Sequence, residues 1–182
     1  MRRVALIALS LLVPVLTACG GGGIGGLIDS IDSSSSSGSG GTHGAGVGAM
    51  SAAEQADADA VLALVNVERA KAQLPPVLRD AAAERAAYDH GVDMDVRKYF
   101  DHTSPAPNST GPGQRLVAAG ATFSGWGENI AMGQPTPAAV MAAWMNSQGH
   151  RDNILNGAFT RLGVGVRYGT GTVLWVQDFL IK

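Results

Sequence analysis

Three ionisable side chains in the second half of this 182-residue chain could act on a bound molecule. Glu128 is the only charged residue in the stretch GWGENIAMG. A buried carboxylate is costly unless a cation or a hydrogen-bond donor pairs with it. His102 lies in KYFDHTSP, at the exit of an expected helix, and His150 follows Gly149, which we expect to end another helix. Neither histidine belongs to an apolar period, so both are candidate cleft residues and candidate partners of Glu128.

Two histidines and one carboxylate can bind a divalent metal or form an acid–base pair. The spacing favours neither, because no two histidines stand four residues apart. The sequence also has no nucleophile elbow, P-loop or dinucleotide-binding glycine pattern. Alternatively, Glu128 accepts hydrogen bonds from backbone amides or a histidine and only holds two loops together. His90 falls on the apolar stripe of an expected helix and is interpreted as a core residue, and His43 as a solvated linker residue.

The first 18 residues have the pattern of an export signal. Arg2 and Arg3 precede an uncharged apolar run over residues 4–15, which suits a signal peptide and is too short to span a bilayer. The run closes on LTAC, which resembles a bacterial lipobox. We therefore predict a lipoprotein signal peptide over residues 1–18 and lipidation of Cys19 with diacylglycerol and palmitate. The alternatives are an ordinary signal sequence with a chance cysteine, or an uncleaved anchor.

Cys19 is the only cysteine, so the chain has no internal disulfide, and an odd thiol in an exported protein needs another role. Lipidation supplies one. Residues 19–50 are rich in Gly and Ser and are interpreted as a disordered tether with a reach of roughly 30 Å. We expect a protein exported and lipid-anchored at the cell envelope, in the outer membrane if the cell is Gram-negative. Its domain would face away from the cytoplasm.

Residues 51–182 suffice for one domain with its own core. The chain carries a net charge of −2 without a basic run, which excludes nucleic acid as a partner. Helical periodicity dominates the first half of the domain. One helix ends before Pro75-Pro76, and Asp80 is expected to cap a second over residues 81–98, with an apolar stripe at Ala83, Ala87, His90 and Met94.

The second half of the domain changes period. A short helix is predicted over residues 115–119, and Thr136-Pro137 begins another. Residues 125–133 read as a strand, and Gly169-Thr170-Gly171 predicts a hairpin between two further strands. Helices first and strands late indicate an α+β domain with helices packed over a small antiparallel sheet.

Six motifs occur in order between Val61 and Phe179: LVNVERAKAQLPPV, YFDHTSP, WGENIAMG, AWMNSQGHRDNIL, LGVGV and WVQDF. Together they resemble the bacterial branch of the CAP superfamily, also called SCP-like or allergen V5/Tpx-1-related. The superfamily comprises cysteine-rich secretory proteins, antigen 5 and pathogenesis-related proteins. The resemblance implies a three-layer α-β-α sandwich, in agreement with the α+β prediction.

The resemblance also implies a cleft lined by two histidines and two glutamates. It assigns the first histidine to His102, the glutamate of the G-E-N motif to Glu128 and the second histidine to His150. In some relatives the paired histidines bind a divalent metal such as zinc, which makes His102 and His150 the expected metal ligands. The second glutamate has no counterpart, because its position is either shortened away or replaced, with Ser147 as the candidate replacement, so a four-group acid–base or metal site is incomplete.

Relatives are variously linked to sterol and lipid binding, antimicrobial defence, channel block and proteolysis, so the fold alone selects no activity. We expect a membrane-tethered binding module for a small apolar or cell-wall-derived ligand, which a metal held by the two histidines could assist, and not an enzyme. One alternative is a hydrolase of envelope substrates, in which His102 or His150 activates water and Glu128 orients the ring. Another is a surface module that binds a protein partner and uses the cluster structurally.

Overall fold

The computed structural model describes residues 48–182. The predicted signal peptide (1–18), Cys19, His43 and most of the predicted tether lie outside the described residues. Within the described part, no helix combines the length and the apolar character needed to cross a membrane.

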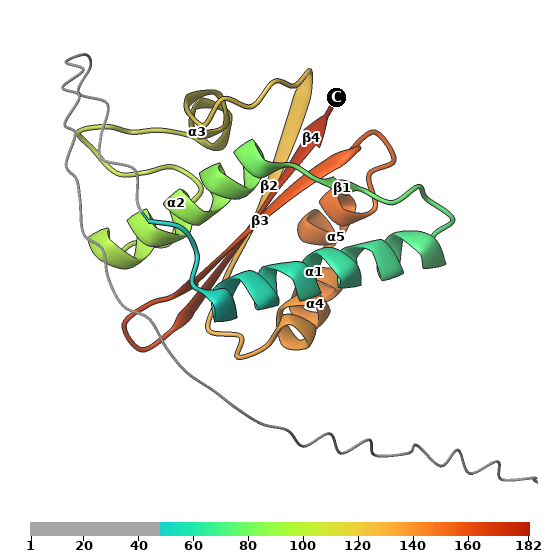
Figure 1. Cartoon of the computed structure of the whole chain (residues 1–182), viewed down its shortest axis with the longest axis horizontal. Helices are drawn as coiled ribbons and strands as arrows, with labels where there is room; N and C mark the ends of the chain where they lie inside the picture. The colour runs from blue at the N-terminus through green and yellow to red at the C-terminus, as the bar shows by residue number, and fades with distance from the viewer. Residues whose placement is uncertain (1–47) are drawn as a thin grey trace, which may run out of the picture. The chain divides into compact units, whose positions relative to one another are not determined.

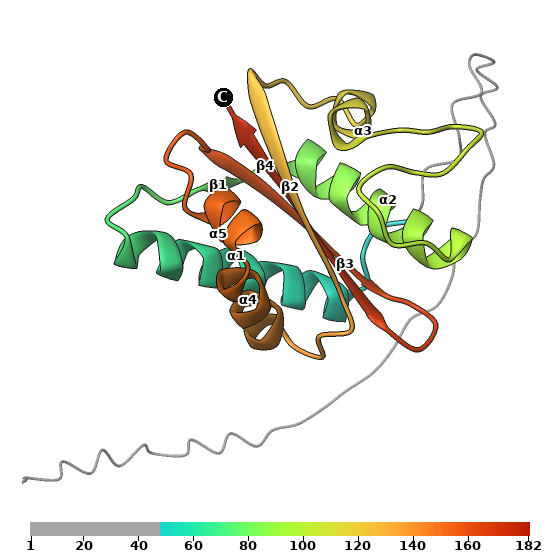
Figure 2. The ribbon, with the colours of Figure 1, turned by 180° about the vertical axis from the view of Figure 1, so that it is seen from behind.

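The described residues form a three-layer sandwich, with a four-stranded sheet between two layers of helices (Figures 1 and 2). One face of the sheet is covered by α1 (Ala52–Lys71), α4 (Pro137–Asn146) and α5 (Gln148–Ile154). The other face is covered by α2 (Ala81–Arg97) and α3 (Pro112–Ala118). The predicted α-β-α architecture is confirmed.

The strands lie in the order β1-β3-β4-β2. They are β1 (Leu78–Arg79), β2 (Gly125–Met132), β3 (Arg161–Tyr168) and β4 (Val173–Ile181). β3 and β4 form the predicted hairpin, and β2 pairs antiparallel with β4. The two-residue β1 was not predicted and pairs parallel with β3. β2 therefore lies at an edge of the sheet, where both helical layers can reach it.

The predicted start of the second helix is confirmed. Asp80 is the N-cap of α2, and its side chain accepts a hydrogen bond from the amide of Ala83 at 3.0 Å. The predicted stripe is buried, including His90 and Met94. The helix ends at Arg97, and its C-cap Lys98 has a left-handed backbone, so the chain turns away from α2 just before the segment that carries His102.

The expectation that Gly149 ends a helix is wrong. α4 ends at Asn146, and the extended backbone of Ser147 (φ −101°, ψ 122°) separates it from α5. Gly149 and His150 lie in the first turn of α5. A serine favours an extended conformation at a helix start, whereas a glycine that ends a helix commonly adopts a left-handed conformation, which Gly149 does not. His150 is therefore carried by a helix and not by a loop.

The glycines of LGVGV allow α2 to lie directly on β3. A Cβ atom at Gly163 would be 2.0 Å from the backbone nitrogen of Glu84, and one at Gly165 would be 2.3 Å from that of Tyr88. Neither space can hold a side chain. This close approach fixes α2 against the sheet and thereby the starting point of the loop that carries His102.

A buried arginine fixes the opposite layer. Arg69 of α1 is fully buried and donates hydrogen bonds to four backbone carbonyls. The acceptors are Pro75 at 2.9 Å, Ile154 at 2.9 Å, Asn156 at 2.8 Å and Phe159 at 3.0 Å. Because Ile154 is the last residue of α5, Arg69 joins α1 to the end of the helix that carries His150.

Candidate functional site

Glu128 lies in the middle of β2 with its side chain only 1% exposed. Its cross-strand neighbour in β4 is Asp178, whose own neighbour in β3 is Gly163. Residues that are directly paired in a sheet point to the same face. Since Gly163 faces α2, Glu128 and Asp178 point into the layer of α2 and α3.

Two positively polarised groups hold the buried carboxylate. The guanidinium of Arg115 donates from Nη2 to Oε2 of Glu128 at 2.6 Å, and Nδ1 of His102 lies 2.7 Å from Oε1. A carboxylate can only accept, so Nδ1 of His102 carries the proton and donates it. The structure thus brings His102 and Glu128 together, as predicted, and adds Arg115 as a second partner of the carboxylate.

Arg115, from α3, was not singled out in the sequence. Besides Glu128, its Nη1 donates to the carbonyls of His102 at 3.0 Å and Thr110 at 2.9 Å. It therefore joins β2 to both ends of the loop that carries His102. An arginine in a short helix usually has a solvated head, so only the structure reveals that the side chain of this one is just 10% exposed.

His102 is half-exposed, with Nδ1 directed to the protein and Nε2 left for a bound molecule. Its hydrogen bond to Glu128 raises the pKa of the ring, against the opposing effect of burial. The preceding residue is fixed from α2, because Nε2 of His90 donates to the carbonyl of Asp101 at 3.1 Å. Burial lowers the pKa of His90 to about 4, so this core histidine is neutral and serves to position the loop.

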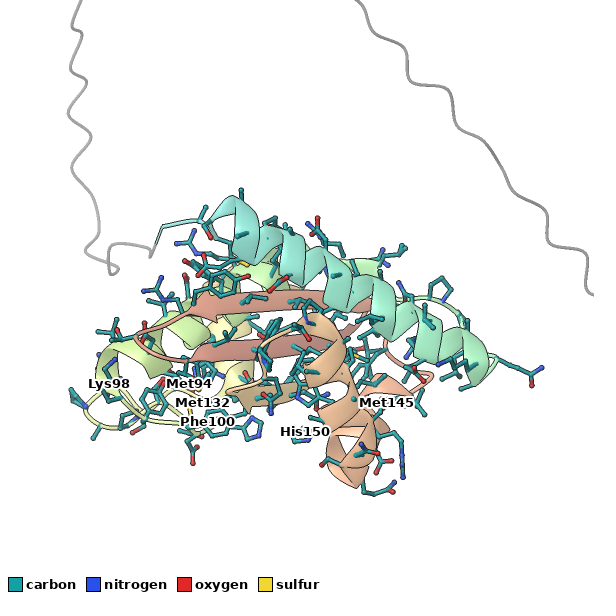
Figure 3. The ribbon with its side chains drawn as sticks, turned by 90° about the horizontal axis from the view of Figure 1, so that it is seen from below. Met94, Lys98, Phe100, Met132, Met145 and His150 are labelled. Atoms are coloured by element: carbon teal, nitrogen blue, oxygen red, sulfur yellow. The ribbon has the colours of Figure 1, made fainter. Side chains whose placement is uncertain are left out.

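His150 is carried by α5, in the helical layer opposite α2 and α3. No hydrogen bond joins its ring to His102 or Glu128 among residues 48–182. It lines a cavity of about 250 Å³, here called the histidine pocket. Other lining residues include Phe100, Ile130, Met132, Ala143 and Trp144. Figure 3 shows Phe100 and His150 next to each other along the edge of the sandwich. Burial and the charge of His102 lower the pKa of His150.

A network of side-chain amides places α5 against β2. The side chain of Asn129 donates to the backbone carbonyl of His150 at 3.1 Å and to the side-chain oxygen of Gln177 at 3.0 Å. Asn153 in α5 donates back to the side-chain oxygen of Asn129 at 2.9 Å and to the carbonyl of Glu128 at 3.2 Å. The Asn of G-E-N therefore positions His150, whereas the Glu positions His102.

Asp178 is fully buried beside Glu128, and neither of its carboxyl oxygens has a hydrogen-bond partner in the described part of the chain. Burial, reinforced by the negative charge of Glu128, raises the pKa of Asp178 well above its usual range. The shift favours the neutral acid at Asp178. The carboxylate of Glu128, in contrast, has two groups that balance its charge.

The donor set fits a catalytic zinc ion poorly. Such a site needs three protein ligands, usually histidines and a carboxylate. Both oxygens of Glu128 are engaged, one by Arg115, and a guanidinium disfavours a second cation nearby. Within residues 48–182, no three His, Cys, Asp or Glu side chains are placed to hold an ion together. His102 and His150 remain as two candidate ligands, one fewer than zinc requires.

The fold and the order of the motifs agree with a known family. Residues 62–179 match the CAP family, described as the cysteine-rich secretory protein family. This chain belongs to that family. YkwD, an uncharacterized protein of Bacillus subtilis (strain 168), is 43% identical over 122 residues, which cover 67% of this chain and 46% of YkwD.

Solved structures show the same fold. An extracellular protein containing an SCP domain from Bacillus anthracis str. Ames has a TM-score of 0.66 and 33% identity, covering 75% of this chain and 45% of that protein. An outer surface protein from Borrelia burgdorferi has a TM-score of 0.64 at 22% identity, covering 70% of this chain and 94% of that protein. The chain spans less than half the length of YkwD and of the B. anthracis protein.

The buried ion pair makes Arg115 a test of the site's architecture. Arg115→Met should lower the free energy of unfolding by about 3–5 kcal/mol, because Glu128 is left as an uncompensated buried charge. Urea unfolding measures this loss. Adding Glu128→Leu should recover part of it, because the unpaired charge is removed. The matched control Arg85→Met, which breaks an exposed pair with Asp89, should cost under about 1 kcal/mol. Equal losses for the two arginines would contradict the assignment.

The pKa values of the two histidines should be shifted in opposite directions from the ordinary value of 6.5, upward for His102 and downward for His150. NMR titration of the ring protons should place the pKa of His102 above that of His150, and Glu128→Gln should lower the pKa of His102. Because the folded-state pKa of His102 is raised, its contribution to stability is complete below about pH 6.5 and is lost as pH rises through that pKa. A pKa of His102 at or below that of His150 would contradict the geometry.

Proposed function

We propose that this chain is an extracytoplasmic binding protein, lipid-anchored through Cys19, whose histidine pocket takes the apolar part of a small ligand. The lipobox-like LTAC and the preceding apolar run support export and anchoring. The B. anthracis relative, 33% identical, is described as extracellular, which supports the same location here. Anchoring by one modified cysteine would leave the whole CAP domain facing away from the cytoplasm.

The observation that carries the binding proposal is the pairing of polar and apolar walls at one place. The ring of His150 lines the histidine pocket together with Phe100, Ile130 and Trp144. Half-exposed His102 lies outside that lining, near enough for its charge to lower the pKa of His150. A few fixed polar groups beside an apolar cavity are typical of small-molecule sites. A cell-wall fragment or a small amphiphile has both kinds of surface.

Hydrolysis is the second candidate, because the lowered pKa of His150 keeps the ring neutral and able to accept a proton near pH 7. The surrounding groups support it less. Among residues 48–182, no serine or threonine hydroxyl hydrogen-bonds to a histidine, so no activated nucleophile is apparent. Glu128, with both oxygens engaged, is not available to activate water.

Replacement of Cys19 tests the anchor. In the expressed full chain, Cys19→Ser should move the protein from the membrane fraction to the soluble or secreted fraction, because the thiol that accepts the lipid is lost. Mass spectrometry of the wild-type N-terminal peptide should show a diacylglyceryl-modified cysteine. Ser30→Ala, within the same segment, is the control and should leave the protein with the membrane. An unmodified Cys19 would exclude the anchor.

A tryptophan placed in the histidine pocket tests the binding site. Muramyl dipeptide, as a cell-wall fragment, and hexanoate, as a small apolar acid, should shift the NMR signals of the His150 ring and the Trp144 indole. Ala143→Trp should weaken the binding of whichever probe binds by tenfold or more, because it fills the pocket. Ala142→Trp is the matched control, since Ala142 is exposed on the same helix but does not line the pocket.

The same experiment separates the rival functions. Turnover of a peptidoglycan fragment that disappears in His150→Ala, with the fold intact, would replace the binding proposal by the hydrolase. Failure of both probes to shift either signal would contradict a small-ligand site of this chemistry. A protein partner whose capture survives Ala143→Trp and Glu128→Gln would instead indicate that the His–Glu cluster is structural.

A further inference from the structure

Asp178 is a second carboxyl group beside Glu128, and the hydrogen bonds of the site leave it without a donor. Its side chain is fully buried in β4, and neither carboxyl oxygen has a hydrogen-bond partner among residues 48–182. Arg115 does not supply one, because its Nη1 and Nη2 donate to other acceptors and its buried Nε has no partner in the described residues. An ionised Asp178 would therefore be a buried charge without a donor, which is highly unfavourable.

The strand register directs Asp178 at Glu128. The amide of Gly133 donates to the carbonyl of Val173 at 2.9 Å, so these residues form a hydrogen-bonded pair of the β2–β4 ladder. Hydrogen-bonded and non-hydrogen-bonded pairs alternate, which makes Glu128 and Asp178 a non-hydrogen-bonded pair, with Cα atoms about 4.5 Å apart and side chains close together. The carbonyl of Glu128 agrees with this register, because it accepts from the side chain of Asn153 and so points away from β4.

The carboxylate of Glu128 has room for a third donor. A carboxylate offers about four lone-pair sites, and Arg115 and His102 occupy one on each oxygen. Two adjacent buried carboxyl groups do not both ionise readily, because like charges repel, and a proton kept on one of them can be donated to the other. Burial, and then the charge of Glu128, raises the pKa of Asp178, in agreement with this arrangement.

We propose that Asp178 is a positioning residue of the site and that, as a carboxylic acid, it donates a hydrogen bond to Glu128. Glu128 then has three donors, which come from β4, from α3 and from the loop after α2. Because Asp178 withdraws part of the negative charge of Glu128, it limits how strongly this carboxylate holds the proton of His102. Asp178 is fully buried and cannot touch a bound molecule, so it acts only through Glu128. The inference goes beyond the proposed function, because it holds whatever molecule the site binds.

The elements packed around Asp178 contribute four other ionisable groups. Glu128 comes from β2 and Arg115 from α3, and both influence Asp178 by their charge. The loop after α2 contributes His102, whose Nδ1 donates to Glu128. Helix α2 contributes His90, whose pKa is lowered to about 4, mainly by burial, so its ring is neutral above that pH. The neighbour in β3 is a glycine and adds no charge. Glu128 is therefore the only carboxylate in this set that can accept the proton of Asp178.

Infrared spectroscopy of the purified full chain locates the proton. An aspartic acid that is protonated at neutral pH should give a carbonyl-stretching band separate from the carboxylate bands, and isotopic labelling of the aspartate carboxyl groups should shift it. Asp178→Asn should abolish this band. The matched control is Asp95→Asn, because Asp95 is also buried but accepts from Lys98 and Arg167, and this variant should keep the band. Absence of the band, or its survival in Asp178→Asn, would overturn the proposal.

The dependence of stability on pH gives a second test. The contribution of Asp178 to stability is complete below its ordinary pKa of 3.8 and is lost as pH rises toward the folded-state pKa. The unfolding equilibrium constant of the wild type relative to Asp178→Asn, measured in urea, should therefore rise about tenfold per pH unit over this interval. Asp95→Asn should instead destabilise the fold at neutral pH, because hydrogen bonds from Lys98, Thr170 and Arg167 outweigh the effect of burial and lower the pKa of Asp95. A ratio for Asp178→Asn that stays constant or falls with pH would contradict the protonated acid.

The pKa of the His102 ring, measured by NMR, tests the positioning role. Asp178→Asn keeps a donor to Glu128 and should leave this pKa nearly unchanged. Asp178→Val removes the donor and should raise it, because Glu128 regains its full negative charge. If Asp178 were ionised, both variants would remove a negative charge and lower the pKa of His102, and that result would overturn the proposal. An unchanged pKa in folded Asp178→Val would exclude the positioning role, and if this variant does not fold, the infrared band of the wild type still decides.

Discussion

The buried ion pair between Glu128 and Arg115 is the interaction on which the cleft depends. A carboxylate with 1% exposure inside a sheet is unfavourable on its own, and a bidentate-capable guanidinium compensates for it with a short, charge-assisted hydrogen bond. Because the same guanidinium binds the carbonyls of His102 and Thr110, the pair also closes the loop over β2. The orientation of His102 is thus a consequence of how one buried charge is neutralised.

The edge position of β2 explains why residues distant in sequence meet there. His102 follows α2 on one face of the sheet, and His150 belongs to α5 on the other. Only at the edge strand can the two layers present side chains to a common space. Arg115 attaches the loop that follows α2 to β2. On the other face, hydrogen bonds from Arg69 and Asn129 hold α5 in place. The separation of the rings is therefore set by two rigid attachments to one strand.

The fold was predictable from the sequence where local signals were strong. Asp80 before an apolar stripe predicted the start of a helix, and Gly169-Thr170-Gly171 predicted the turn of a hairpin. Helix α2 and the β3–β4 hairpin are both present. The extent of the cluster around Glu128 was not predictable, because Arg115 and Asp178 take their roles from contacts between residues far apart along the chain. The prediction that Gly149 ends a helix was wrong because, in sequence, a glycine in the first turn of a helix cannot be distinguished from one that follows a helix. His102 and His150 were candidates because neither belongs to an apolar period, and the order of the family motifs then assigned both to one site.

The absence of a second glutamate in the sequence shapes the chemistry of the two rings. His102 has a carboxylate partner, which raises its pKa, whereas His150 has none in the described part of the chain, so burial and the charge of His102 lower its pKa. The negative charge of Glu128 is satisfied by Arg115 and His102 within the protein. One ring then favours the cation and the other the neutral base. A group that accepts a hydrogen bond from His102 and donates one to His150 would suit both rings without requiring either to change its charge.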